Sequence, residues 1–316
     1  MNFRARRRSG ILLHPTALPG PHGIGDIGPH AYRFVDHLSD MNQSLWQILP
    51  IGPTDFHNSP YSSISTFAGN HLLISLHLLV EDGLLDFKFL ESFTQVDVHK
   101  ILFDDVIHFK GSILKQVSRD FDMNASSKMK ISFEKFCIDH SYWLDEYSRY
   151  WALKEENEQK SWIDWKSETV KNAEHVHEAK VIQFIFHDQW HRLHQYCREK
   201  GIQIIGDMPI YIGYDSVDVY ANQELFQLDD SGRMIYQGGC PPCEYQKEGQ
   251  LWENPLYNWE NHERTNFKWW QQRFKKLLKM VDAIRLDHFI GYTKYYRIPI
   301  GDQTAHNGEW IQAPGD

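Results

Sequence analysis

An arginine and an aspartate stand two residues apart in one short apolar segment, Val281 to Phe289 (VDAIRLDHF). The apolar residues of this segment predict a buried strand of a parallel sheet. Side chains at positions i and i+2 of a strand share a face, so Arg285 and Asp287 should emerge side by side. A carboxylate kept ionised by a neighbouring guanidinium can act as a nucleophile or stabilise a cation. A buried ion pair without a catalytic role is the alternative that this segment leaves open.

The order of elements around this segment predicts an α/β fold with a parallel sheet. Short buried strands are expected in Gly10–Pro15, Ser44–Pro53 and Ile202–Ile210, with helices that begin near Pro29 and near Ser167 between them. Two segments interrupt this alternation. Residues 72–165 have helical periodicity and predict an inserted helical subdomain, whereas 211–266 predict an inserted loop region. The long loop after the second strand is of the kind that carries function.

Composition restricts the class of protein. The 316 residues are 41% hydrophobic and 24% charged, which allows a substantial core, and the net charge of −9 argues against binding to nucleic acid. We find neither an apolar run of transmembrane length nor a signal-peptide core, and expect no membrane partner. Four cysteines in a chain of this size favour a reducing compartment, so we expect a cytoplasmic location. Aromatic residues make up 14% of the chain, many in polar loops, which favours a groove for sugar rings.

Two further patterns have simpler explanations than the chemistry they suggest. The spacing i, i+4, i+7 of His187, His191 and His194 could present three imidazoles to a metal ion, but an exposed polar helix face is the simpler explanation. Cys240 and Cys243 form a CxxC pattern without a following helix or a second ligand pair. We therefore expect no metal site and interpret the cysteines as two thiols in a binding loop.

Five motifs together resemble glycoside hydrolase family 77 of the α-amylase clan, the 4-α-glucanotransferases called amylomaltases or disproportionating enzymes. They are HPTALPGPHGIGDIG, SPYSSISTFAGN, GDMPIYIGYDSVDVYAN, GQLWENPLYNW and AIRLDHFIGY, in the family's order. The resemblance implies a (β/α)8 TIM barrel with inserted subdomains, of which this chain would supply about the first half. On that basis we divide the chain into five units. They are a barrel start (1–71), a helical insertion (72–165), a helix with the third strand (166–210), a substrate-binding insertion (211–266) and a segment with the fourth strand (267–316).

The resemblance also implies roles for single residues. Asp287 aligns with the family's nucleophile, and Arg285 with the arginine that orients the nucleophile and keeps it ionised. The other matched positions line sugar subsites, where Tyr61 would stack on the sugar at the cleavage point; these positions are Ser59, Tyr61, Asp207, Gln250, Trp252 and His288. No metal or organic cofactor is implied. Cys243 and Ile290 replace an Asp and an Arg of the family, and we expect these changes to alter subsite affinity.

The implied activity is transfer of α-1,4-glucan segments between maltooligosaccharides by a retaining double displacement. One carboxylate forms a covalent glycosyl-enzyme, and a second carboxyl group protonates the leaving oxygen. The family's acid/base follows on a later strand, beyond Asp316. We therefore expect the chain to be inactive alone and to be part of a longer product or to pair with a complementary C-terminal chain. A non-catalytic α-glucan-binding protein and an α-glucan hydrolase of the same clan stay open as alternatives.

Overall fold

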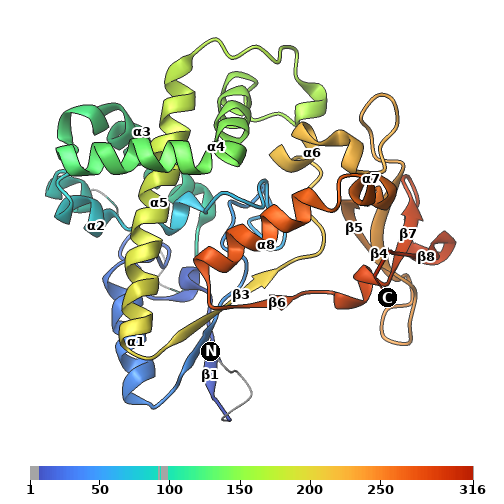
Figure 1. Ribbon diagram of the computed structural model, residues 1–316, viewed down its shortest axis with the longest axis horizontal. Coiled ribbons are helices and arrows are strands. Elements are labelled where there is room, and N and C mark those ends of the chain that lie inside the picture. Colours follow the sequence, from blue (N-terminus) through green and yellow to red (C-terminus); the bar gives the residue numbers. More distant parts are fainter. Residues whose placement is uncertain (1–6, 92, 94–98, 316) are drawn as a thin grey trace.

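The computed structural model describes residues 7–91, 93 and 99–315, so parts of the predicted units 1–71, 72–165 and 267–316 lie outside the described residues. The described chain has three parts (Figure 1). A parallel sheet with its covering helices lies below an inserted group of helices, and a small antiparallel sheet lies to one side. None of the described helices combines the length and the apolar composition needed to cross a membrane.

The parallel sheet has the strand order β1-β2-β3-β6. Its strands are β1 (Gly10–Leu12), β2 (Leu45–Gln47), β3 (Gln203–Met208) and β6 (Ala283–Leu286). Each lies inside a segment predicted to be a strand, although the paired part is shorter. In the register of β3 and β6, Asp207 faces Arg285. Residues of the third predicted strand and of the fourth are therefore neighbours at the carboxyl edge of the sheet.

Three helices cover this sheet: α1 (Pro29–Asp40), α5 (Ala173–Glu199) and α8 (Lys268–Met280). The predicted start of α1 at Pro29 is confirmed, and Val35 and Leu38 on its inner face are fully buried. The predicted end of α5 is also confirmed, because Gly201 has φ of +76°, the left-handed conformation that glycine adopts after a helix. Trp190 of α5 donates to the carbonyl of Met280, which joins α5 to α8.

The long loop after β2 is fastened to α5 by two buried glutamines. Gln183 accepts from the Gly69 amide at 2.7 Å and donates to the Gly69 carbonyl at 2.9 Å. Gln189 makes the same pair of hydrogen bonds with Ser75. Gly69 approaches the ring of Phe186 so closely that a Cβ there would lie 1.9 Å from it, so only glycine fits. This fastening fixes the loop that carries Ser59 and Tyr61.

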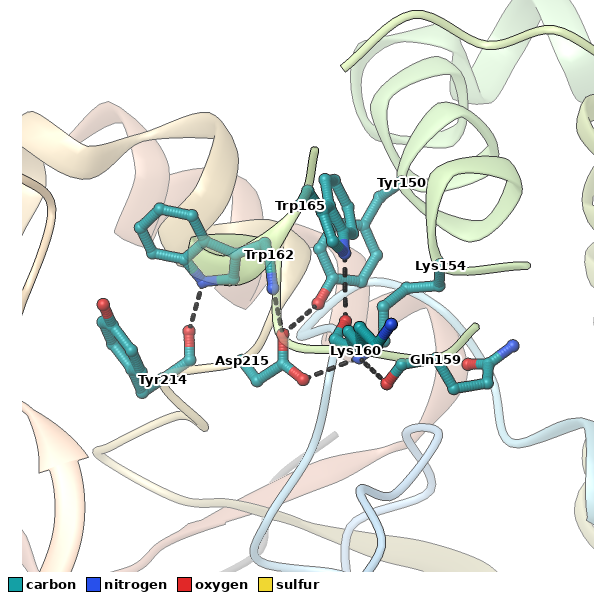
Figure 2. Close-up of polar contacts among 8 residues, drawn as sticks. All are labelled: Tyr150, Lys154, Gln159, Lys160, Trp162, Trp165, Tyr214 and Asp215. Atoms are coloured by element: carbon teal, nitrogen blue, oxygen red, sulfur yellow. Dashed lines mark hydrogen bonds and ion pairs between the residues drawn. The ribbon is translucent and has the colours of Figure 1, made fainter. Parts of the chain in front are cut away.

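The inserted helices are α2 (Leu76–Glu81), α3 (Phe103–Asn124) and α4 (Ser127–Glu156), of which α3 and α4 pack against α5 (Figure 1). Figure 2 shows how the end of α4 is joined to the segment after β3. Asp215 accepts from Tyr150 at 2.9 Å and from Lys154 at 2.6 Å, and from the backbone amide of Trp162. The helical insertion is thereby tied to the segment that follows Asp207.

The second insertion is not only a loop region. It contains α6 (Val217–Ala221), β4 (Tyr236–Cys240), β5 (Gln250–Pro255) and α7 (Trp259–Arg264). Strands β4 and β5 form an antiparallel sheet with β7 (Lys294–Pro299) and β8 (Glu309–Gln312), in the order β5-β4-β7-β8. Residues before and after β6 thus build one sheet beside the strand that carries Arg285.

The exposed helix face proposed for the three histidines is wrong for two of them. His194 is buried and contacts Asp282 at 2.9 Å, and Asp282 also accepts from the Ile204 amide. His187 contacts the buried amine of Lys276 at 2.8 Å. A helix as long as α5 is covered on more than one face, which a single-helix pattern does not reveal. No group of three metal-binding side chains is found among the described residues.

Candidate active site

Arg285 bridges two carboxylates at the carboxyl ends of β3 and β6. One of its terminal nitrogens donates to Asp207 at 2.6 Å, and the other donates to Asp287 at 2.6 Å. The expected position of Arg285 beside Asp287 is confirmed, because the two side chains lie on the same face of the strand. Burial disfavours the charge of Arg285, but the two carboxylates outweigh it and raise its pKa. Arg285 is thus a permanent cation between two acids.

The backbone around Asp287 is held on both sides. The amide of Asp287 donates to the carbonyl of Met208 at 3.1 Å, one residue past the last ladder pair of β6. The next residue, His288, has φ of 46° and ψ of 48°, a left-handed conformation that costs a non-glycine residue on the order of 1 kcal/mol. This turn lies just past the end of β6, and the side chain of Asp287 stays partly exposed, at 32%. The carboxylate is therefore fixed in direction and still accessible.

Asp207 lies beneath Arg285, with a fully buried side chain. Tyr61 donates to the same carboxylate oxygen at 2.7 Å, while the other oxygen, Oδ1, has no hydrogen-bond partner among the described residues. Burial raises the pKa of Asp207, although the Tyr61 hydrogen bond and the Arg285 charge oppose that shift. Burial and the bond to Asp207 raise the pKa of Tyr61 to about 12. Tyr61 is thus a neutral donor, and Asp207 fixes the position of the Arg285 guanidinium by accepting its hydrogen bond.

Aromatic rings form a wall beside the nucleophile candidate. The ring of His288 meets that of Trp252 edge-on, with centroids 4.9 Å apart. Gln250, two residues earlier on β5, accepts from the Trp252 indole at 2.7 Å. Burial lowers the pKa of His288, although Asp287 opposes that shift, so a neutral imidazole is favoured. Such a wall offers a ring face and neutral hydrogen-bonding groups, the combination that a sugar requires.

Tyr211 is a residue of this wall that sequence reasoning missed. Its ring lies 6.0 Å from that of Trp252 and 6.5 Å from that of His288, measured between centroids. Its place three residues after the end of β3 is the signal that could have identified it, because loops at the carboxyl ends of barrel strands build the sites of such folds.

Ser59 completes the set by shaping the loop before Tyr61. Its hydroxyl oxygen accepts from the Tyr61 amide at 3.3 Å, and its carbonyl accepts from the Ser62 amide at 3.0 Å. The structure thus joins all the predicted positions through contacts or chain neighbours: Ser59, Tyr61, Asp207, Gln250, Trp252, Arg285, Asp287 and His288. Of the two departures from the family pattern, Cys243 is an exposed free thiol and Ile290 is 42% exposed.

Comparisons with known proteins agree with this geometry. A family model described as 4-alpha-glucanotransferase matches residues 13–316. The 4-alpha-glucanotransferase of Aquifex aeolicus is 42% identical over 98% of this chain and 64% of its own length. The chloroplastic/amyloplastic 4-alpha-glucanotransferase of Solanum tuberosum is 37% identical over 98% of this chain and 56% of its own.

A solved structure extends the comparison to three dimensions. The amylomaltase from Streptococcus agalactiae, in complex with acarbose, has a TM-score of 0.93 and 35% identity to this chain, and the match covers 98% of this chain and 65% of that one. This likeness confirms the predicted fold class, an α/β structure of the amylomaltase type. The chain spans less than two thirds of the length of each of these three relatives.

Proposed function

The chain belongs to the 4-alpha-glucanotransferase family, and on that premise we propose that it carries the nucleophile of a retaining transferase that acts on α-1,4-glucans. Asp287 attacks the anomeric carbon of a bound glucan and forms the covalent glycosyl-enzyme. The observation that carries this proposal is the bridge of Arg285 between the buried Asp207 and the accessible Asp287. The bridge fixes the direction of the Asp287 carboxylate at the end of its strand, and a fixed position of the attacking group raises the rate of the reaction.

The sugar is held by the surfaces around this carboxylate. Trp252 and His288 offer a ring surface on one side, with the buried ring of Tyr211 next to them, and Tyr61 and Ser59 contribute the loop on the other. Maltooligosaccharides and α-1,4-glucans are the partners that we propose. Acarbose in the Streptococcus agalactiae amylomaltase supports this class, since a family member holds a sugar-like ligand. Asp207, predicted to bind substrate, takes a supporting place instead, because its side chain is covered.

The acid that protonates the leaving oxygen is assigned to no residue of this chain. The resemblance places it on a later strand of the barrel, but β7 and β8, the described strands after β6, belong to the antiparallel sheet. We therefore propose that residues 1–316 do not complete transfer alone and that a following segment or a complementary chain supplies the acid/base. We also propose a cytoplasmic location, which the free thiols of Cys137, Cys197, Cys240 and Cys243 support.

Incubation with maltotriose tests the proposed activity. A protein that contains residues 1–316 together with the segment that supplies the acid should convert maltotriose into glucose and a ladder of longer oligosaccharides, resolved by chromatography. Residues 1–316 expressed alone should give no ladder. Accumulation of glucose and maltose without longer products would favour the hydrolase, and binding without any product would favour the glucan-binding protein.

Two substitutions of Tyr61 test its role. Tyr61→Phe keeps the ring but removes the hydrogen bond to Asp207, so we expect a loss of transfer rate of about tenfold, near the value of one hydrogen bond to a charged group. Tyr61→Ala removes the ring as well and should lose about 10²-fold or more. Initial rates with maltotriose measure both. A larger loss in the Phe variant would show that the hydroxyl, and not the stacking surface, is what matters.

A further inference from the structure

A second groove is lined by residues of α4, α6 and α8 and does not include Trp252 or His288. Figure 1 shows where these three helices lie. The volume of the groove is about 410 Å³, which falls within the usual range for small-molecule sites. Ser65 and Phe67 line this groove, and the same two residues line the cavity beneath Tyr61 and Asp207. The loop that carries Tyr61 thus contributes to the lining of both hollows.

One wall of the groove presents an exposed aromatic ring. Tyr142 of α4 is 45% exposed, which is high for a tyrosine beside a hydrophobic core. Its ring meets Phe67 edge-on, with centroids 6.1 Å apart and an interplanar angle of 89°. The ring of His140 lies 6.5 Å away, measured between centroids, so two ring contacts hold Tyr142 in place. A held, half-exposed ring is the kind of surface on which the C–H face of a sugar can stack.

Hydrogen-bond donors and acceptors both surround this ring. Glu146 lies one turn after Tyr142 on α4, and its carboxylate is 3.9 Å from Arg149, which also donates to the backbone carbonyl of Glu168 at 3.0 Å. The exposed carboxylate of Glu168 and the amide of Gln272 face the same hollow. Two carboxylates beside one guanidinium disfavour an anionic ligand such as a phosphate ester. The lining instead suits a neutral ligand that has many hydroxyl groups.

We propose that this groove is a second α-glucan-binding site that retains a polymeric substrate next to the loop of the active site. The identity of the sugar rests on the proposed function, whereas the groove itself is defined by its ring and its polar lining. A chain held here is kept at a raised local concentration near Asp287, because the second contact becomes intramolecular. The gain in apparent affinity should grow with the length of the glucan and be absent for maltotriose.

The test measures retention of the protein in native gels that contain soluble starch. Tyr142→Ala should weaken starch binding about tenfold, the effect expected of a central aromatic contact, and Glu146→Ala should weaken it several-fold. The matched controls lie on the same helix outside the groove. Ile138→Ala removes a side chain that is 75% exposed, Glu134→Ala removes an exposed carboxylate, and both should bind starch as the wild type does. Circular dichroism verifies that each variant is folded.

A test of Tyr142→Ala in a protein that also has Trp252→Ala separates this proposal from the proposed function. Trp252→Ala weakens the candidate active site, and Tyr142→Ala should still reduce the starch retention that remains. Loss from Tyr142→Ala with no effect of Trp252→Ala would count against the active-site assignment but uphold the groove. The proposal is overturned by a folded Tyr142→Ala protein that is retained like the wild type, by equal losses in the control variants, or by a wild-type chain that starch does not retain.

Discussion

Asp287→Asn should abolish glucan transfer while leaving oligosaccharide binding largely intact. The amide has nearly the shape of the carboxylate but cannot form the ester with the anomeric carbon, so we expect a loss of kcat on the order of 10⁴-fold or more. Arg285 can still contact the amide oxygen, so the site should keep its shape. The assay is transfer from maltotriose by a protein that also contains the acid-bearing segment, together with a titration of maltoheptaose binding.

Asp230→Asn is the matched control for this variant, because Asp230 is exposed and lies in the turn before β4. It should transfer glucan at the wild-type rate. Retained turnover in Asp287→Asn would remove the nucleophile assignment, because another group would then have to attack the anomeric carbon. Loss of binding as well as turnover would show that the substitution had disturbed the sugar surface, and not only the chemistry.

Arg285→Met should lower kcat about 10²-fold or more, because the guanidinium that holds both acids is removed and a misplacement of about 1 Å can cost that much. Asp207 loses a cation that opposes the effect of burial, so its pKa should rise further. The substrate KM should change less than kcat, since Arg285 acts through Asp287 and not through the sugar. Steady-state kinetics with maltooligosaccharides separates the two parameters.

Arg285→Lys distinguishes charge from geometry. A lysine keeps the positive charge, but its single ammonium cannot reproduce the two separate contacts of 2.6 Å to Asp207 and Asp287. We expect this variant to recover only part of the lost rate. Arg297→Met, which removes an ion pair with Glu309 in the antiparallel sheet, is the control and should be nearly neutral. Full recovery in Arg285→Lys would mean that charge alone suffices.

Local sequence patterns predicted those features that depend on neighbours along the chain. The strand carrying Arg285 and Asp287 could be predicted because the period of two in a strand places alternate residues on one face. The start of α1 at Pro29 and the end of α5 before Gly201 follow from the backbone preferences of proline and glycine. The remaining site residues came from resemblance to a family, since their own neighbours in the chain do not indicate a sugar site.

Features that join distant segments could not be predicted in this way. The sequence predicts a loop region without strands in 211–266. In the structure β4 pairs with β5 inside this region and with β7 on its other side, and β7 takes that place only when the segment after β6 folds back. The histidines of α5 were predicted to be exposed, but His194 finds Asp282 at a separation of 88 residues. A pattern within one helix carries no information about which faces other elements will cover.

The sequence by itself determined the pair of Arg285 and Asp287 at one strand, the alternation of strands and helices, and the family to which the motifs belong. Only the tertiary structure decided that Asp207 lies buried beneath Arg285, that Tyr61 reaches it across 146 residues, and that Tyr211 joins the aromatic wall. The physical reason is the register of β3 and β6, which brings residues 207 and 285 face to face. Periodicity acts over a few residues, whereas burial and charge pairing depend on how the whole sheet is assembled.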